Sequence, residues 1–351
     1  MENNEIKKSP FSLQLDVSDF LPADQSEKES LVVMREPRSF FKDGMHKLLH
    51  NPVAVGAIVV LVLIIIYAFI LPAFWPYSYE EQIRGSEKLA PMQYSETELQ
   101  KIAAGEKIFP HILGTDSLGR DYMVRTMIGA RISISVGVVA SVLILIIGSI
   151  YGACAGYFGG KIDMVMMRIV DVIYTVPDTI IIILLAVTLK EPIKSFAAKF
   201  NVTWMNKIGV NMICIFVVFA LLYWVGMARI VRSQVLIIKE QEFVTAAKAL
   251  GAKSGRIIRK HLLTNCIGTL IVTTTLQIPS AIFTESFLSF IGLGVNAPMP
   301  SLGSLASDAI DGIRSYPHRL MAPALLISLI ILAFNLLGDG LRDAFDPKLK
   351  K

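Results

Sequence analysis

Two carboxylates stand inside strongly apolar stretches of this sequence, Asp178 and Glu285. A charged side chain in a helix that crosses a bilayer is costly unless it faces protein or water, so such a residue often marks the route of a substrate or an ion. Asp178 and Glu285 could therefore line a hydrated path for a peptide backbone or an amino group, or they could carry protons. In the alternative interpretation, each lies near the end of its apolar stretch and is hydrogen-bonded to a neighbouring helix.

A third polar position is Gln277, which follows the run Thr273-Thr274-Thr275. These four side chains make an otherwise apolar stretch unusually polar. A helix of this composition faces the interior of a helix bundle more often than it faces lipid, because its polar groups need partners. We therefore predict that this stretch, with Gln277, lines the pathway.

A run of turn-forming residues contains three side chains that could indicate a metal site: His111, Asp116 and Asp121. Their spacing fits neither the zinc nor the calcium pattern. We expect instead a compact folded loop, in which aspartates and glycines close turns. The cysteines, odd in number and without paired spacing, indicate neither a disulfide framework nor a zinc site. They are Cys154, Cys214 and Cys266.

The glycines Gly159 and Gly160, followed by Lys161, raise the question of a phosphate-binding loop. A Walker A loop is excluded here, because Ala155 stands at its first glycine position and Ile162 follows the lysine where serine or threonine is required. The sequence shows no such loop elsewhere. The chain is therefore not expected to bind or hydrolyse ATP itself, nor to hold a metal or another cofactor.

The elements that must position these side chains are membrane-spanning helices. The 351 residues are 53% hydrophobic, with a mean hydropathy of +0.56. The apolar residues are gathered in blocks of about 20, the length of helix that crosses a bilayer. The sequence therefore predicts an all-α membrane protein with six transmembrane helices. The expected spans are 52–75, 132–157, 169–189, 208–228, 267–291 and 320–337.

These spans divide the chain into five regions. A polar tail, 1–51, precedes the first helix, 52–75, and contains no early apolar core of the kind found in a cleaved secretory signal. A hydrophilic region, 76–130, separates that helix from a five-helix core, 131–343. A short polar tail, 344–351, follows the core.

Lysine and arginine residues set the expected orientation. Of the 34 such residues, 21 lie in segments that are internal when the N-terminus is inside, and 13 lie in the outer segments. This bias predicts that both termini and the loop 240–266 are cytoplasmic and that the region 76–130 is extracellular. The net charge of +5 is concentrated at the ends of apolar runs, which favours a role in membrane orientation over nucleic-acid binding.

The loop 240–266 contains a short stretch, Glu242–Gly251, whose small and helix-forming residues predict one brief helix ended by Gly251. Ala246 and Ala247 leave a low face that the groove of a partner could approach closely. A basic run follows, made of Lys253, Arg256, Arg259 and Lys260. We interpret the loop as a docking element for another protein; alternatively, the helix packs on its own chain.

This loop resembles the EAA loop of ATP-binding-cassette importer permeases. The resemblance rests on Ala246-Ala247, then Gly251, then His261-Leu262-Leu263 and Asn265, with Thr264 where the pattern usually has proline. The longer run from Glu242 to Ala252 is similar to the peptide-permease branch. Further runs that resemble the C-type peptide permeases are 113–121, 285–294, 298–303 and 338–347, so the resemblance extends over about residues 40–351.

The resemblance implies a type I importer permease fold, in which Glu242–Gly251 is the coupling helix that sits in a cleft of an ATPase subunit. The implied coupling residues are Glu242, Phe243, Ala246, Ala247, Leu250 and Gly251. It also implies a complex in the bacterial plasma membrane. This chain and a homologous B-type permease would form the channel, two cytoplasmic ATPases would bind ATP and Mg, and an extracellular lipoprotein would deliver a peptide.

Three alternatives stay open on the sequence. Permeases for nickel or another solute share this architecture and many of the motifs, although the five histidines, none clearly in the middle of a span, favour peptide over metal as cargo. A proton- or ion-coupled carrier would use Asp178 or Glu285 and would need no ATPase. A membrane anchor for cytoplasmic partners would transport nothing.

Overall fold

The computed structural model describes residues 40–200, 209–295 and 299–345, and these residues form helices and loops without a strand. The chain divides into two compact units, Met1–Asp43 and Gly44–Lys351, and the arrangement given below is that of the second. Most of the predicted N-terminal tail and the end of the predicted C-terminal tail lie outside the described residues. The helix α2, Phe40–His50, occupies the last part of the predicted region 1–51.

Among the described residues, five helical segments are long and apolar enough to cross a membrane, and the count is six if a bent pair of helices is one span. The all-α membrane fold is therefore confirmed, and the count is compatible with the six predicted spans. The five segments are Pro52–Ala73 (α3, Pro52–Ile65, with the π-helix Ile66–Ile70 and the 3-10 turn Leu71–Ala73), α5 (Tyr122–Phe158), α9 with α10 (Val210–Leu222 and Trp224–Ile238), α14 (Ile267–Phe290) and α16 (Pro317–Phe345). The bent pair is α6 (Gly160–Thr175) and α7 (Asp178–Lys199).

The third predicted span, 169–189, is wrong as a continuous helix. The helix α6 ends at Thr175, α7 begins at Asp178, and the two axes differ in direction by 88°. Pro177 causes the break, because it has no backbone N–H and it disfavours a helical conformation of the residue before it. Val176 accordingly adopts an extended conformation, with φ −89° and ψ 135°.

Three further spans differ in their bounds from the prediction. The fourth, predicted as 208–228, extends to Ile238, the last residue of α10. The helix α5 begins at Tyr122, ten residues before the expected start of the second span, so the region predicted as 76–130 ends at Asp121. The Asp121 carboxylate accepts a hydrogen bond from the backbone N–H of Val124 and so caps the helix ahead of the apolar run. The sixth span is also longer than 320–337, because α16 continues to Phe345. Helix formation does not stop where apolar composition stops.

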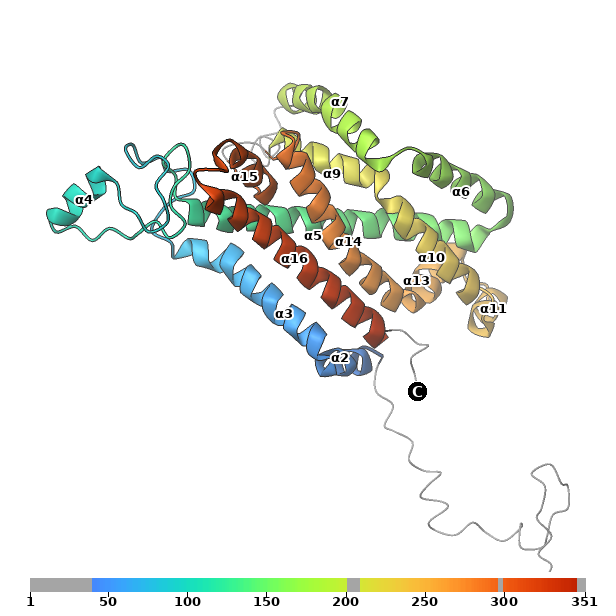
Figure 1. The fold of residues 1–351 in the computed structure, drawn as a ribbon. Helices are drawn as coiled ribbons and strands as arrows, with labels where there is room; N and C mark the ends of the chain where they lie inside the picture. Colours follow the sequence, from blue (N-terminus) through green and yellow to red (C-terminus); the bar gives the residue numbers. More distant parts are fainter. Residues whose placement is uncertain (1–39, 201–208, 296–298, 346–351) are drawn as a thin grey trace, which may run out of the picture. The chain divides into compact units, whose positions relative to one another are not determined.

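The long helix α5 is the centre of the packing. Helix α10 packs along it on one side and α14 on another, and α16 joins α14 to α3 (Figure 1). Close approach of α10 depends on Gly148, Gly152 and Gly156, which recur every four residues and therefore share one face of α5. A Cβ at Gly148 would lie 2.6 Å from Cβ of Met227, and one at Gly152 would overlap the carbonyl group of Ala228.

Polar segments lie at opposite ends of this bundle (Figure 1). At one end, residues 74–121 carry the short helix α4, Glu96–Ala103, and lead into α5; we call them the outer segment after the orientation predicted from the sequence. At the other end, the loop between α10 and α14 carries α11 (Glu242–Ala249), α12 (Ser254–Arg256), the π-helix η4 (Ile257–Leu262) and α13 (Leu263–Asn265). The helix α15, Leu302–Asp308, packs near the start of α16 and is followed by the 3-10 turn Ile310–Gly312.

Candidate functional site

The predicted docking helix is present as α11, Glu242–Ala249. Gln241 before it is extended, with φ −70° and ψ 146°, and Gly251 after it has a φ of +77°. A left-handed residue ends a helix, and glycine adopts that conformation without the steric cost that a Cβ imposes. The predicted helix and its stop at Gly251 are therefore confirmed.

One side of α11 is anchored in the chain and the other side is open. Val244 is fully buried in a cluster with Met227, Ile257 and Leu262, which joins α11 to α10 and to η4. The predicted coupling residues are exposed except Ala247, which is half-buried; the exposed ones are Glu242, Phe243, Ala246, Leu250 and Gly251. The alternative, in which the helix only packs on its own chain, accounts for the Val244 side alone.

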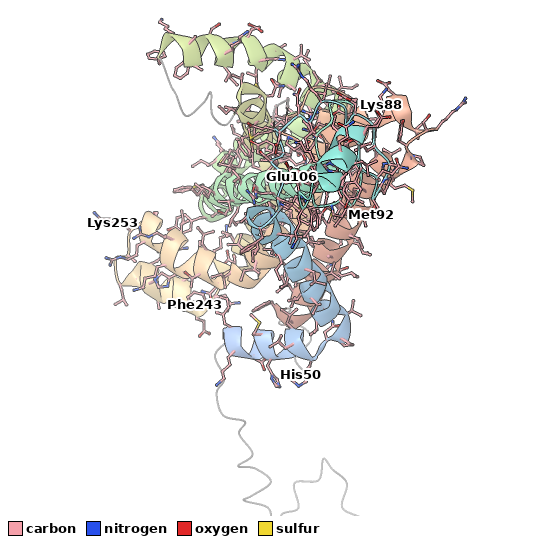
Figure 2. All side chains as sticks on the ribbon, turned by 90° about the vertical axis from the view of Figure 1, so that its left-hand side faces the viewer. His50, Lys88, Met92, Glu106, Phe243 and Lys253 are labelled. Atoms are coloured by element: carbon pink, nitrogen blue, oxygen red, sulfur yellow. The ribbon has the colours of Figure 1, made fainter. Side chains whose placement is uncertain are left out.

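The open side combines two large apolar side chains with positive charge. Phe243 is 41% exposed and Leu250 is 89% exposed. The basic run is exposed on the two segments that follow, at Lys253, Arg256, Arg259 and Lys260. Figure 2 shows Phe243 and Lys253 on this loop at the margin of the bundle. Such a surface can seat in an apolar cleft whose rim is acidic.

A cavity of about 150 Å³ lies where the bent pair meets α9, α10 and α14. Asp178 is the first residue of α7, and Gln277 is the eleventh of the 24 residues of α14. Tyr223, which joins α9 to α10, lies midway along the segment Val210–Ile238. The cavity is therefore at half the depth of the spans. Its lining is Ile173, Tyr174, Asp178, Leu222, Tyr223, Val225, Gly226 and Gln277.

The structure thus brings together two of the three pathway residues predicted separately, Asp178 and Gln277. Sequence reasoning missed the tyrosines Tyr174 and Tyr223. Tyr174 lies four residues before Asp178, but the helix breaks between them, so this spacing could not have indicated a shared helix face. The Tyr223 hydroxyl is 2.7 Å from Oγ1 of Thr284, a hydrogen bond between the α9–α10 junction and α14.

The third predicted residue, Glu285, has a different environment. Its side chain has no exposed surface. The hydroxyls of Ser133 and Ser289 each donate a hydrogen bond of 2.7 Å to its carboxylate, and Ser133 belongs to α5. Ser133 also accepts a hydrogen bond of 3.3 Å from the backbone N–H of Leu302. Glu285 therefore faces the interior of its own chain and joins α14 to α5, as the hydrogen-bonded alternative expected.

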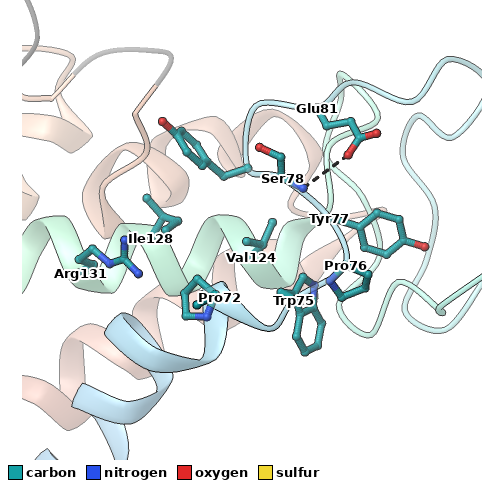
Figure 3. A pocket seen from close by; sticks show the side chains of 11 residues that line it. Pro72, Trp75, Pro76, Tyr77, Ser78, Glu81, Val124, Ile128 and Arg131 are labelled. Carbon is teal, nitrogen blue, oxygen red and sulfur yellow. Dashed lines mark hydrogen bonds between the residues drawn. The ribbon is translucent and has the colours of Figure 1, made fainter.

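A larger cavity, about 510 Å³, lies at the outer end between the end of the first span and α5 (Figure 3). Trp75 and Arg131 line it. Pro72 has no N–H to donate to the carbonyl of Ala68, and Nε of Arg131 donates to that oxygen at 2.9 Å instead. The guanidinium therefore serves the backbone of the first span. None of the predicted site residues lies in this cavity.

The outer segment contains a buried cluster built on His111. Its Nδ1 is 2.8 Å from Oδ2 of Asp121, and its Nε2 is 3.0 Å from Oε1 of Glu98. All three side chains are buried, and the ring of Tyr77 stacks on the imidazole at a centroid distance of 4.5 Å. This cluster, which we call the His111 cluster, ties α4 and the loop to the first residues of α5. His111 and Asp121, two of the three side chains that could have indicated a metal site, are therefore paired directly with each other.

Asp116, the third of these side chains, is not part of the cluster. Its Oδ2 accepts a hydrogen bond of 2.6 Å from Nε of Arg120, and its Oδ1 accepts one of 2.8 Å from the backbone N–H of Leu118. These bonds close the turn, as the sequence predicts for this run. Within residues 40–200, 209–295 and 299–345, no group of three or more His, Cys, Asp or Glu side chains could hold a metal ion.

The pKa values of the His111 cluster follow from this pairing. Burial alone would lower the pKa of His111, but the hydrogen bonds to Asp121 and Glu98 raise it above its ordinary value of 6.5. Burial alone would raise the pKa of Glu98, but the backbone N–H of Ser95 and the imidazole of His111 lower it below 4.5. Each partner therefore favours the charged form of the other.

Two family models match the chain. One is described as binding-protein-dependent transport system inner membrane component and matches residues 144–351. The other is described as the N-terminal TM domain of oligopeptide transport permease C and matches residues 39–91.

Several relatives are similar over nearly the whole chain. It is 40% identical over 332 residues to the oligopeptide transport system permease protein OppC of Bacillus subtilis (strain 168), covering 95% of this chain and 97% of the relative. It is 42% identical over 333 residues to the dipeptide transport system permease protein DppC of the same strain, covering 95% and 93%. The identity to OppC of Escherichia coli (strain K12) is 37% over 313 residues, covering 89% and 93%.

Proposed function

The chain belongs to the family of binding-protein-dependent transport system inner membrane components, and from this premise we propose that it is a transmembrane permease subunit of an ATP-driven importer of peptides. The observation that carries the proposal is the similarity, over 95% of the chain, to relatives named as oligopeptide and dipeptide permeases. The subunit is a membrane permease and not an enzyme. ATP and Mg would be bound by its partners.

The mechanism proposed for α11 is the transmission of movement from an ATPase to the spans. The exposed side chains Phe243 and Leu250 would seat in a cleft of a cytoplasmic ATPase subunit. Val244 on the opposite side is buried in a cluster that includes residues of α10 and η4, so a displacement of α11 would be passed to these elements. A second route leads through the π-helix η4 to α13 and α14. Both helices that α11 would move line the cavity at half depth.

The pathway is proposed to run through that cavity. One chain supplies only part of its wall, and a homologous B-type permease would supply the rest. Two ATPases would lie on the side of α11, and an extracellular substrate-binding lipoprotein would dock at the side of the outer segment. With this orientation both termini are cytoplasmic and the complex lies in the bacterial plasma membrane.

The test is reconstitution of this chain with the permease, ATPases and lipoprotein encoded beside it. We expect ATP-dependent uptake of a labelled peptide into proteoliposomes. Uptake of Ni²⁺ in place of peptide would support the nickel alternative, and uptake by this chain without ATPases would support an ion-coupled carrier. Failure to transport any solute, with ATPases bound, would support an anchor.

A variant links the uptake to α11. Proline holds φ near −65°, whereas residue 251 has a φ of +77°, so Gly251→Pro must displace the end of α11. We expect inserted protein in which ATP hydrolysis no longer drives uptake. Gly255→Ala in the same loop is the control, because an added Cβ there meets nothing within 4 Å. Normal coupling in Gly251→Pro would contradict the role proposed for α11.

A further inference from the structure

The cavity at half depth carries one formal charge, that of Asp178. The other residues of its lining are apolar, aromatic or uncharged polar side chains, apart from Gly226. A carboxylate at this depth of a membrane protein is costly unless a cation or a hydrated space compensates it. Its charge therefore needs a source of compensation.

The chain itself does not supply that compensation. In the described residues the Asp178 carboxylate has no hydrogen-bond or ion-pair partner. Arg229 of the neighbouring helix α10 is engaged elsewhere: its Nη2 lies 2.9 Å from Oδ1 of Asp171, and its guanidinium lies over the ring of Tyr174 at 4.3 Å. Asp178 therefore presents an uncompensated negative charge to the cavity.

The lining around this charge fits an organic cation. Tyr174 and Tyr223 provide aromatic walls, and aromatic faces attract cations. Gln277 adds an amide that can both donate to a carbonyl and accept from an N–H group. The cavity contains a single carboxylate with no His or Cys beside it, a donor set too small for a transition metal.

The part of the cavity that this chain lines has room for one end of a cargo. Its space of about 150 Å³ can hold an ammonium group and the atoms next to it. It also lies where two spans are interrupted, at Pro177 and at Tyr223. Transporters commonly place their substrate sites near the middle of the membrane at such discontinuous helices.

We propose that this cavity is a subsite for the free α-amino group of the cargo, with Asp178 as its counter-charge and Gln277 as partner of the first peptide unit. The inference rests on the proposed peptide import. It makes the permease itself, and not only a binding protein, selective for a free amino terminus. The pathway therefore recognises one end of the peptide and is indifferent to the side chains further along.

The experiment uses the complete reconstituted transporter and two labelled peptides of one sequence, one with a free amino terminus and one N-acetylated. The quantity measured is the ratio of their uptake efficiencies, kcat/KM, with and without Asp178→Asn. We expect the ratio to fall by about tenfold or more, the effect of losing one charged hydrogen bond, because uptake of the free peptide alone declines. The binding protein is the same in the unsubstituted transporter and in Asp178→Asn. Any preference that it has for one peptide therefore cancels when the two uptake ratios are compared.

Two further variants complete the design. Asp178→Glu keeps the charge and should retain most of the preference. Glu191→Gln removes an exposed carboxylate from the same helix away from the cavity and should leave the ratio unchanged. Equal loss of both peptides in Asp178→Asn, or no change in either, overturns the inference while peptide import stands. Absence of uptake of both peptides by the unsubstituted transporter overturns the proposed function and the inference with it.

Discussion

The outer segment and the α11 loop lie at opposite ends of the bundle, and charged side chains are buried in the outer segment but not in the α11 loop (Figure 1). In the outer segment, charged groups are buried and paired, as in the His111 cluster. In the α11 loop, large apolar groups are exposed, above all Leu250 at 89%. Buried pairs that satisfy one another hold a segment together, whereas exposed apolar side chains without a partner in the chain indicate a partner outside it.

The same contrast separates the two carboxylates singled out in the spans. Glu285 is enclosed by serine hydroxyls and has no exposed surface, whereas Asp178 is exposed at a cavity. Two carboxylates that the sequence did not distinguish thus have different environments. Substitution in the closed environments should reduce stability, and substitution in the open ones should reduce interaction with partners or cargo.

The largest effect is expected for His111→Ala. Removing the imidazole leaves the carboxylates of Glu98 and Asp121 buried without their cation, which costs about 3–5 kcal/mol when one member of a buried pair is lost. Thermal unfolding in detergent and limited proteolysis of the outer segment measure it. Glu106→Ala, exposed in the same segment, is the control. An unchanged midpoint of thermal unfolding in His111→Ala would contradict the stabilising role given to the His111 cluster.

Leu250→Ala should give the next largest effect. It should weaken the association with the ATPases and leave the stability of the chain unchanged. A large apolar side chain at the centre of an interface contributes about 2–4 kcal/mol when it is a hot spot, so retention of the ATPases should fall by at least tenfold. Stability should stay within about 0.5 kcal/mol, because the side chain has few contacts in its own chain. Loss of stability with intact ATPase binding would contradict the assignment of Leu250 to the open region.

The two carboxylates can be compared directly through amide substitutions. Glu285→Gln replaces one acceptor oxygen with a donor that faces serine hydroxyls, and it should cost about 1–3 kcal/mol of stability. Asp178→Asn should not lower stability, because it removes an uncompensated charge. Thermal unfolding of both variants in one detergent checks the difference. Equal effects would mean that the two environments are not distinct.

The smallest effect is the pH dependence of the outer segment. The folded pKa of His111 lies above 6.5, so its stabilising contribution is complete below that pH and is lost as the pH rises through the folded pKa. The folded pKa of Glu98 lies below 4.5, so its contribution is present above pH 4.5 and is lost as the pH falls through the folded pKa. Burial and nearby carboxylates raise the pKa of Tyr77 to about 12, outside this range.

Resistance of the outer segment to proteolysis should therefore be greatest between pH 4.5 and 6.5. Hydrogen exchange of α4 across this range measures the same quantity. The dependence on the alkaline side should disappear in His111→Ala. A protein that grows steadily more stable from pH 6 to pH 8 would show that the imidazole is not charged in the cluster.

Local features were determined by the sequence alone. Blocks of apolar residues predicted the helical spans, the four-residue spacing of Gly148, Gly152 and Gly156 puts them on one helix face, and Gly251 predicted the end of α11. Each depends on residues within a few turns of one another, and the physical signal acts over the same range: helix length, a missing Cβ, a left-handed φ. The break at Pro177 could also have been predicted from the sequence, because proline acts on its neighbours. The angle of 88° between α6 and α7 could not.

Only the tertiary structure decided which polar residues meet. Asp178 and Gln277 are about a hundred residues apart in the chain and share a cavity, while Glu285, eight residues from Gln277, is enclosed against Ser133 of another helix. The sequence of an apolar span indicates that a carboxylate within it needs a partner, but several helices could supply that partner. Which helix does so depends on how the rigid helices pack, because a rotation of one helix by a fraction of a turn exchanges an open position for a closed one.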